Sequence, residues 1–233
     1  MPELSSQASQ FQKGVLATLP LVIAAFPFGV VYGAMAEEVG LSFMLAVGMS
    51  ALVFGGASQF IAVTLLAAGA VSVVIVATIF VVNLRHMLYS ANLMTHVSHW
   101  PQRWRVLLSF VLTDETFATV SNYIQQQPNT PGLRWFYFGS AAFMYSFWIL
   151  ASALGFWLAE TIPNLSAWGL EVAMIVAFVG IVVPAIKTHA HWACALSAFV
   201  TMLLCYDWPY QLGLLFAVLV SVVVGLMVRG KVS

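Results

Sequence analysis

The sequence predicts an all-α polytopic membrane protein with about 6 to 8 transmembrane helices. Of its 233 residues, 62% are hydrophobic and only 7% are charged. Its mean hydropathy of +0.96 lies far above that of ordinary soluble domains. The eight basic and eight acidic residues cancel, so the charge balance gives no indication of a nucleic-acid partner. Most of the chain is therefore expected to lie in the lipid bilayer.

Apolar segments of spanning length follow one another with short connections. They occupy residues 15–36, 41–69, 71–95, 105–125, 134–159, 168–186, 190–206 and 210–228. The first is longer than the apolar region of a signal peptide and contains Pro20 and Pro27, so we interpret it as a retained helix. We expect a polar cytoplasmic N-terminus at 1–14, a single transmembrane domain at 15–229 and a cytoplasmic tail at 230–233.

The second and fourth segments allow two topologies. Eight continuous spans would place Arg103 and Arg105 outside, which conflicts with the enrichment of basic residues on the cytoplasmic side. If both segments are instead interrupted, re-entrant pairs of half-helices, seven of the basic residues become cytoplasmic and five of the acidic residues lie outside. The basic set is Lys13, Arg103, Arg105, Arg134, Lys187, Arg229 and Lys231, and the acidic set is Glu37, Glu38, Glu160, Glu171 and Asp207.

The second segment has features that favour an interruption. A straight helix over 41–69 would run roughly 43 Å, which exceeds a hydrocarbon core of about 30 Å. The run Gly55-Gly56-Ala57-Ser58-Gln59 near its middle permits a break and offers polar groups there. A tilted, continuous helix is the alternative, so the sequence leaves both topologies open.

Arg85 lies inside the apolar run 81–89, where a charge costs at least roughly 2.5 kcal/mol. The only carboxylates at comparable depth are Asp114 and Glu115, midway along the fourth segment. We expect Arg85 to pair with one of them and the other to be free to carry a proton. Asn83, His86 and Tyr89 add polar faces to the third segment, which indicates that it lies in the bundle interior.

This combination predicts a binding site for a small solute. Interrupted helices near the bilayer midplane are typical of secondary transporters. An amino acid zwitterion needs an anion for its ammonium group, which Asp114 or Glu115 would supply, and a cation or backbone N–H groups for its carboxylate, which Arg85 or the Gly55-Gly56 break would supply. A channel-like or structural subunit of a membrane complex is the alternative, in which the charges only fasten helices together.

Several motifs of enzymes are missing from the sequence. No His-Glu-x-x-His zinc site, no Gly-x-Ser-x-Gly nucleophile element and no Walker lysine motif occurs. We therefore expect no enzymatic activity, no metal site, no cofactor and no nucleotide binding through a P-loop.

Three linked runs carry a resemblance to a known family. The runs Phe54-Gly55-Gly56-Ala57-Ser58-Gln59-Phe60, Asn83-Leu84-Arg85-His86-Met87-Leu88-Tyr89 and Leu112-Thr113-Asp114-Glu115-Thr116-Phe117-Ala118 resemble those of the large subunit of AzlC-type branched-chain amino acid exporters. The resemblance covers essentially the whole chain. It departs from the family at Gly56, where alanine is common.

The resemblance implies a multi-pass permease of the bacterial cell inner membrane that exports valine, leucine or isoleucine, and in some members methionine. It also implies a small AzlD-type membrane subunit as partner. Proton coupling is our hypothesis for this exporter. The candidate substrate-binding or coupling residues are Gly55, Gly56, Ser58, Gln59, Asn83, Arg85, His86, Tyr89, Thr113, Asp114 and Glu115.

Overall fold

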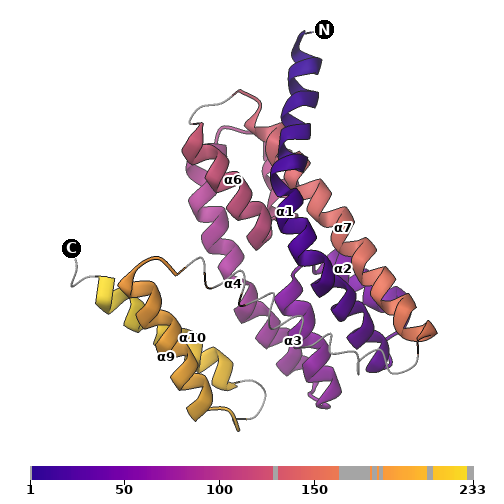
Figure 1. Cartoon of the computed structure of the whole chain (residues 1–233), viewed down its shortest axis with the longest axis vertical. Coiled ribbons are helices and arrows are strands. Elements are labelled where there is room, and N and C mark those ends of the chain that lie inside the picture. Colours follow the sequence, from indigo (N-terminus) through magenta and orange to yellow (C-terminus); the bar gives the residue numbers. More distant parts are fainter. Residues whose placement is uncertain are drawn as a thin grey trace.

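The computed structural model describes residues 2–127, 131–162, 186–208 and 212–229, with the single positions 179 and 183. These residues form helices and turns, with no strand among them, which confirms the all-α polytopic membrane fold (Figure 1). The helices are α1 (Pro2–Glu38), α2 (Phe43–Leu52), α3 (Gly56–Ala67), α4 (Ser72–Val97), α5 (Gln102–Phe110), α6 (Asp114–Gln126), α7 (Leu133–Thr161), α9 (His189–Leu204) and α10 (Leu212–Arg229). Most of the expected segment 168–186 lies outside the described residues.

Within the described chain, α1, α4 and α7 are the three helices long and apolar enough to cross a bilayer. Helix α1 begins at Pro2, so the helix extends well before residue 15, where the apolar segment starts. The extension is stabilised by packing against α7, where the Phe11 and Phe138 rings lie 5.8 Å apart. The expected polar N-terminus is thus the first part of a long helix.

Small residues let α1 and α7 pack backbone to backbone. A Cβ atom on Gly29 would lie 2.6 Å from the Cβ of Ala151, and one on Gly33 would lie 2.6 Å from the backbone N of Phe156. The Thr18 hydroxyl donates a hydrogen bond to Ser140 Oγ at 2.6 Å, also across this interface. Close approach through glycine is the usual way that membrane helices associate, and it fixes α1 and α7 as one unit.

Helices α2 and α3 form a re-entrant pair. Along α2, Phe43 contacts Phe156 at a ring distance of 5.6 Å, and Ser50 donates a 2.8 Å hydrogen bond to Ser152. The helix then ends, and α3 runs back beside α1 and α4, so that Val63 lies in one cluster with Tyr32 and Phe156. The chain therefore enters and leaves from the same end of the bundle.

Helices α5 and α6 form a second re-entrant pair, which enters from the opposite end. Trp104 of α5 packs against Trp135 near the start of α7 at a ring distance of 5.3 Å, and Phe110 reaches Tyr145. Helix α6 then returns, and Tyr123 stacks on Phe136 with ring centroids 3.8 Å apart. For both segments the structure selects the re-entrant topology over continuous spans.

Two tyrosines of α7 form hydrogen bonds with the first helix of each pair, α2 and α5. The Tyr145 hydroxyl donates to the carbonyl of Ala51 at 2.9 Å, and the Tyr137 hydroxyl donates to the carbonyl of Leu108, also at 2.9 Å. Both carbonyls belong to the last turn of a helix, where the C=O groups have no hydrogen-bond partner within the helix itself. Helix α7 thus supports both breaks.

Apart from Glu3 at the start of α1 and the three charged residues between the ends, Arg85, Asp114 and Glu115, the charges of α1 to α7 separate to the two ends of this body. Lys13, Arg103, Arg105 and Arg134 lie on the elements at the end where α7 begins, called here the basic end. Glu37, Glu38 and Glu160 lie where α1 and α7 end, called the acidic end. Glu171 and Lys231 fall outside the described residues.

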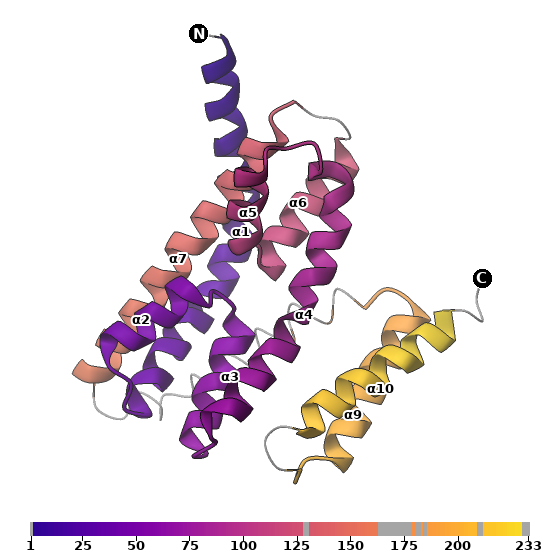
Figure 2. The same ribbon diagram turned by 180° about the vertical axis from the view of Figure 1, so that it is seen from behind.

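The first six helices repeat one arrangement in opposite directions. Helix α1 runs toward the acidic end and is followed by the pair α2–α3 from that end. Helix α4 runs back, since Ile75 packs with Leu65 of α3 while Leu93 lies in the cluster that contains Trp100. It is followed by the pair α5–α6 from the basic end (Figures 1 and 2). Helices α9 and α10 pack against each other as a hairpin (Figure 2).

Candidate functional site

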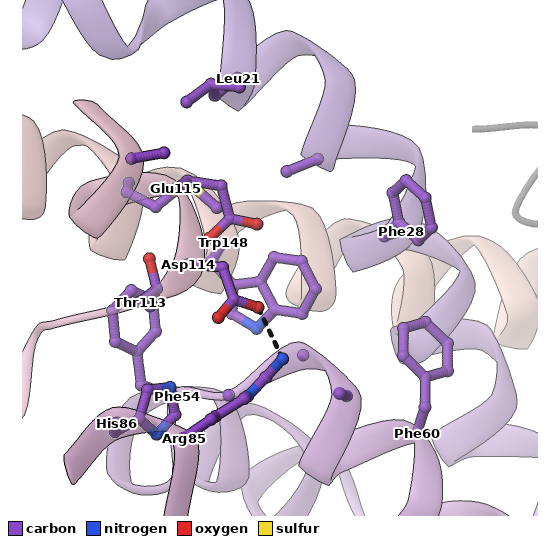
Figure 3. Close-up of a pocket in the computed structure, with 16 residues that line it drawn as sticks. Leu21, Phe28, Phe54, Phe60, Arg85, His86, Thr113, Asp114, Glu115 and Trp148 are labelled. Carbon is purple, nitrogen blue, oxygen red and sulfur yellow. Dashed lines mark ion pairs between the residues drawn. The ribbon is translucent and has the colours of Figure 1, made fainter. Parts of the chain in front are cut away.

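The two interruptions face a common cavity of about 220 Å³, called here the central cavity. It lies between the starts of α3 and α6 and is closed by α1, α4 and α7. Its wall is mainly apolar and aromatic. The apolar lining comprises Leu21, Ala25, Phe28, Phe54, Ala57, Phe60, Ala118, Met144 and Trp148, several of which are labelled in Figure 3.

Arg85 reaches from α4 to the first residue of α6. Its Nη1 atom lies 2.7 Å from Oδ2 of Asp114, and the two side chains are 30% and 43% exposed (Figure 3). Of the two carboxylates considered from the sequence, the structure therefore pairs Arg85 with Asp114. The Nε atom of Arg85 and Oδ1 of Asp114 are buried without a hydrogen-bond partner. One donor of Arg85 and one acceptor of Asp114 are therefore available to a molecule in the cavity.

Glu115 is the second carboxylate on the cavity wall and is partly buried. Arg85–Asp114 is the one ion pair among the described residues, so Glu115 forms no ion pair in that part of the chain. It sits in the first turn of α6, where the partial positive charge of the helix N-terminus favours an anion. A carboxylate in this setting is available to an ammonium group or a proton.

The two helix starts at the cavity differ chemically. Thr113 caps α6, with its hydroxyl accepting a hydrogen bond from the N–H of Thr116 at 3.4 Å, and two acidic residues follow. Helix α3 begins after Gly55 with no side-chain cap and no acidic residue in its first turn. Its first N–H groups have no partner within the helix and present partial positive charge to the cavity.

Phe54 precedes the start of α3 in an unusual backbone conformation. Its φ angle of +41° lies in the left-handed region, which costs roughly 1 to 3 kcal/mol for a non-glycine residue. Contacts on its side chain hold it there, since its ring packs edge-on against Tyr145 at 4.9 Å. This strained residue turns the chain and places an aromatic ring in the cavity wall.

The candidate residues from the sequence divide into two groups. Those that line the central cavity are Gly55, Gly56, Arg85, His86, Thr113, Asp114 and Glu115. Those that lie behind its wall are Ser58, Gln59, Asn83 and Tyr89. The second group fastens helices: the Ser58 hydroxyl donates to Asn83 Oδ1 at 2.5 Å, and Tyr89 stacks on Phe117 at 4.5 Å.

Gln59 holds the tryptophan of the cavity wall. It is fully buried and accepts a 2.8 Å hydrogen bond from Nε1 of Trp148 at its Oε1 atom. Its Nε2 atom donates to Ser50 Oγ at 2.9 Å, and Ser50 is in turn bonded to Ser152. This network joins α2, α3 and α7 and fixes the orientation of the indole.

Sequence reasoning missed Trp148, Met144 and Phe28, because an apolar residue in a spanning segment gives no sign of which face meets a cavity. For Trp148 a signal existed. It lies in the middle of its segment, whereas interfacial tryptophans lie at segment ends, and a buried indole N–H requires an acceptor. Gln59 was a suitable acceptor in the sequence.

Comparison with known proteins identifies the family. The family model described as AzlC protein matches residues 20–162, which is more than half of the chain and includes every residue of the central cavity. The chain belongs to the AzlC family. No solved structure matches it.

Curated relatives of this AzlC-family chain come from bacteria and archaea. An "Inner membrane protein YgaZ" of Escherichia coli is 28% identical over 66% of the chain and 63% of its own length. An "Uncharacterized membrane protein" of Archaeoglobus fulgidus is 33% identical over 67% of the chain and 66% of its own length. A "Branched-chain amino acid transport protein AzlC" of Bacillus subtilis is 22% identical over 72% and 65%, respectively.

The match covers slightly less than two thirds of the length of these relatives. Their names and the long apolar helices identify this AzlC-family chain as a multi-pass inner membrane protein of a transport family.

Proposed function

We propose that this AzlC-family chain is the large subunit of a secondary transporter that exports branched-chain amino acids, with methionine as a further substrate. The Bacillus subtilis relative is named as a branched-chain amino acid transport protein. The observation that carries the proposal is the central cavity, where an uncapped helix start, an acidic helix start and an apolar wall face one another. A small AzlD-type membrane subunit is the proposed partner.

The uncapped start of α3 suits the carboxylate of an amino acid. Its free N–H groups and helix dipole favour an anion, and no acidic side chain in its first turn competes. Gly55 and Gly56 leave the backbone open to the cavity, which lets a ligand approach closely. Arg85 adds positive charge nearby, although its ion pair with Asp114 offsets part of that charge.

The acidic start of α6 suits the ammonium group. Glu115 forms no ion pair among the described residues, and Asp114 retains a buried oxygen without a hydrogen bond. The apolar wall, with Phe28, Phe60 and Trp148, then surrounds the side chain. At about 220 Å³ the cavity is smaller than the roughly 300–1,000 Å³ of sites for drug-sized ligands and fits a small amino acid.

The proposed coupling uses Glu115 as the proton carrier. A carboxylate that loses the ammonium group of a departing substrate takes up a proton in its place, which exchanges one inward proton for one outward substrate. The charge distribution supports an orientation of the chain in the membrane, since basic residues concentrate on the cytoplasmic side of membrane proteins. We therefore place the basic end, residues 1–14 and the tail 230–233 in the cytoplasm.

Counterflow in proteoliposomes tests the function. Vesicles that contain the chain and its small partner are preloaded with valine, and uptake of labelled valine is measured with leucine, methionine and lysine as competitors. We expect saturable counterflow that leucine and methionine inhibit and lysine does not. Glu115→Gln abolishes its proton dependence, whereas the control Glu160→Gln, an exposed residue at the acidic end, leaves it unchanged.

Two results would contradict the proposal. Flux that does not saturate and shows no counterflow would indicate a channel-like subunit. Intact proton-dependent counterflow in both Asp114→Asn and Glu115→Gln would remove the carboxylates from the mechanism.

A further inference from the structure

A second cavity adjoins the central cavity on the side of the basic end. It has a volume of about 400 Å³ and lies between α1 and α6, and it is called here the outer cavity. Leu21 of α1 and Ala118 of α6 line both cavities. The two spaces therefore meet across this pair of side chains.

The outer cavity contains an unsatisfied polar group. The Thr119 residue is 8% exposed, and its hydroxyl is buried with no hydrogen-bond partner. A buried hydroxyl without a partner costs roughly 1 to 3 kcal/mol, so a group that enters this space and bonds to it is stabilised. Asn122 and Gln126 continue the polar surface along α6 toward the basic end.

The opposite wall is apolar. Ala17 and Leu21 of α1 and Phe136 of α7 face the polar side chains of α6 across the cavity. A passage with one polar wall and one apolar wall matches a molecule that has a zwitterionic head and an apolar side chain. At its outer part α6 is tied to α1 by the Tyr123 hydroxyl, which donates to Gln10 Oε1 at 2.9 Å.

The central cavity is closed toward the acidic end. Phe60 lines the cavity on that side and meets Tyr32 edge-on at 6.2 Å. Beyond it, Tyr32, Val63 and Phe156 are packed in a cluster with exposures of 0%, 0% and 2%. Figure 3 shows Phe28 and Phe60 together on the side of the cavity opposite Thr113.

We propose that the outer cavity is the entry site through which an apolar amino acid reaches the central cavity from the basic end, with Leu21 and Ala118 as the constriction. This deepens the proposed function and rests on it for the substrate. Asn122 and Gln126 of its polar wall are exposed, so the outer cavity opens toward the basic end in this state, beside the Tyr123–Gln10 hydrogen bond. During passage, the Thr119 hydroxyl forms a hydrogen bond with the zwitterion in place of one that the zwitterion made with water.

Cysteine labelling tests the order of the sites along this route. In full-length chain with Cys194 and Cys205 replaced by alanine, Thr119→Cys reports on the outer cavity and Ala57→Cys on the central cavity. Each is treated with a membrane-impermeant maleimide from either side of sealed membrane vesicles that also contain the partner subunit. We expect both to react from the side of the basic end and neither from the other side.

A larger side chain at the constriction provides the decisive comparison. Ala118→Leu abolishes the reaction of Ala57→Cys from the basic end but leaves Thr119→Cys reactive, which also shows that the variant is folded. The control Ala91→Leu, at an exposed alanine of α4, changes neither reaction. Reaction of Ala57→Cys from the acidic end alone, or its persistence in Ala118→Leu, would overturn the proposal, as would failure of Thr119→Cys to react.

Protection by substrate separates this inference from the proposed function. Valine is added before the maleimide, and we expect it to slow the reaction of Ala57→Cys. If the labelling order is as expected but valine, leucine and methionine give no protection, the route stands and the proposed substrate is wrong.

Discussion

Nη1 of Arg85 lies 2.7 Å from Oδ2 of Asp114, and this ion pair joins the middle of α4 to the first turn of α6. Each partner keeps one buried atom without a hydrogen bond, Nε on the arginine and Oδ1 on the aspartate. The pair therefore has two roles: it connects the two helices and offers both signs of charge to the cavity.

The structural role predicts energetic coupling between these two residues. Asp114→Asn and Arg85→Gln each leave the opposite charge in the bundle without its partner, whereas the double variant removes both charges. We expect a coupling energy of about 1 to 3 kcal/mol in a double-mutant cycle, measured by thermal unfolding in detergent. Strictly additive effects of the two single substitutions would show that the pair does not hold α4 and α6 together.

The binding role predicts a different result for Arg85→Lys. Lysine retains the positive charge that Asp114 needs but lacks the planar fork of donors that a carboxylate recognises. We expect the Tm of the variant to stay near that of the parent while the valine concentration for half-maximal counterflow rises about tenfold, or about 1.4 kcal/mol. A fall in Tm with unchanged valine affinity would assign Arg85 to helix attachment alone.

The two interruptions differed in how well the sequence revealed them. Gly55 and Gly56 mark the first, and the excess length of that segment supports it. The second break contains neither glycine nor proline, and only the sidedness of Arg103 and Arg105 suggested it. A local signal was present, since Thr113 followed by two acidic residues is typical of a helix start.

The position of α7 beside the cavity was beyond sequence reasoning for a physical reason. Its glycines, Tyr145 and Trp148 act through contacts with residues about 90 to 130 positions away, such as the bond of Trp148 to Gln59. Periodicity within one segment reports only local faces. In a segment that is apolar all round, periodicity does not distinguish the lipid-facing side from the cavity side.

Gly56 is predicted to set the size of the cavity. A Cβ atom there would lie 3.0 Å from Cη2 and 3.2 Å from Cζ2 of Trp148, so Gly56→Ala pushes the indole by a few tenths of an ångström. We expect counterflow of leucine and methionine to weaken more than that of valine. The matched control is Gly48→Ala in α2, where a Cβ meets nothing within 4 Å. An equal loss for all three substrates would show that the indole does not determine size selectivity.

Gln59 is predicted to stabilise the α2–α3 pair against α7. Gln59→Leu removes the acceptor of the Trp148 N–H and the donor to Ser50 in a fully buried position. The indole N–H then loses its partner, whereas Ser50 keeps its hydrogen bond to Ser152. We expect a loss of roughly 1 to 3 kcal/mol for the unpaired indole N–H, seen as a lower Tm in detergent. The exposed Gln102→Leu serves as control and leaves Tm unchanged.

A second substitution in the Gln59→Leu background distinguishes the structural role of Trp148 from its role in substrate binding. Trp148→Phe in the Gln59→Leu background removes the unpaired N–H group and should recover part of the lost Tm, since an apolar pair has no polar group to satisfy. Valine affinity stays reduced in the double variant, because the smaller ring no longer fills the wall opposite Gly56. Full recovery of valine affinity together with Tm would mean that Trp148 acts only as a structural contact and that the cavity wall tolerates its loss.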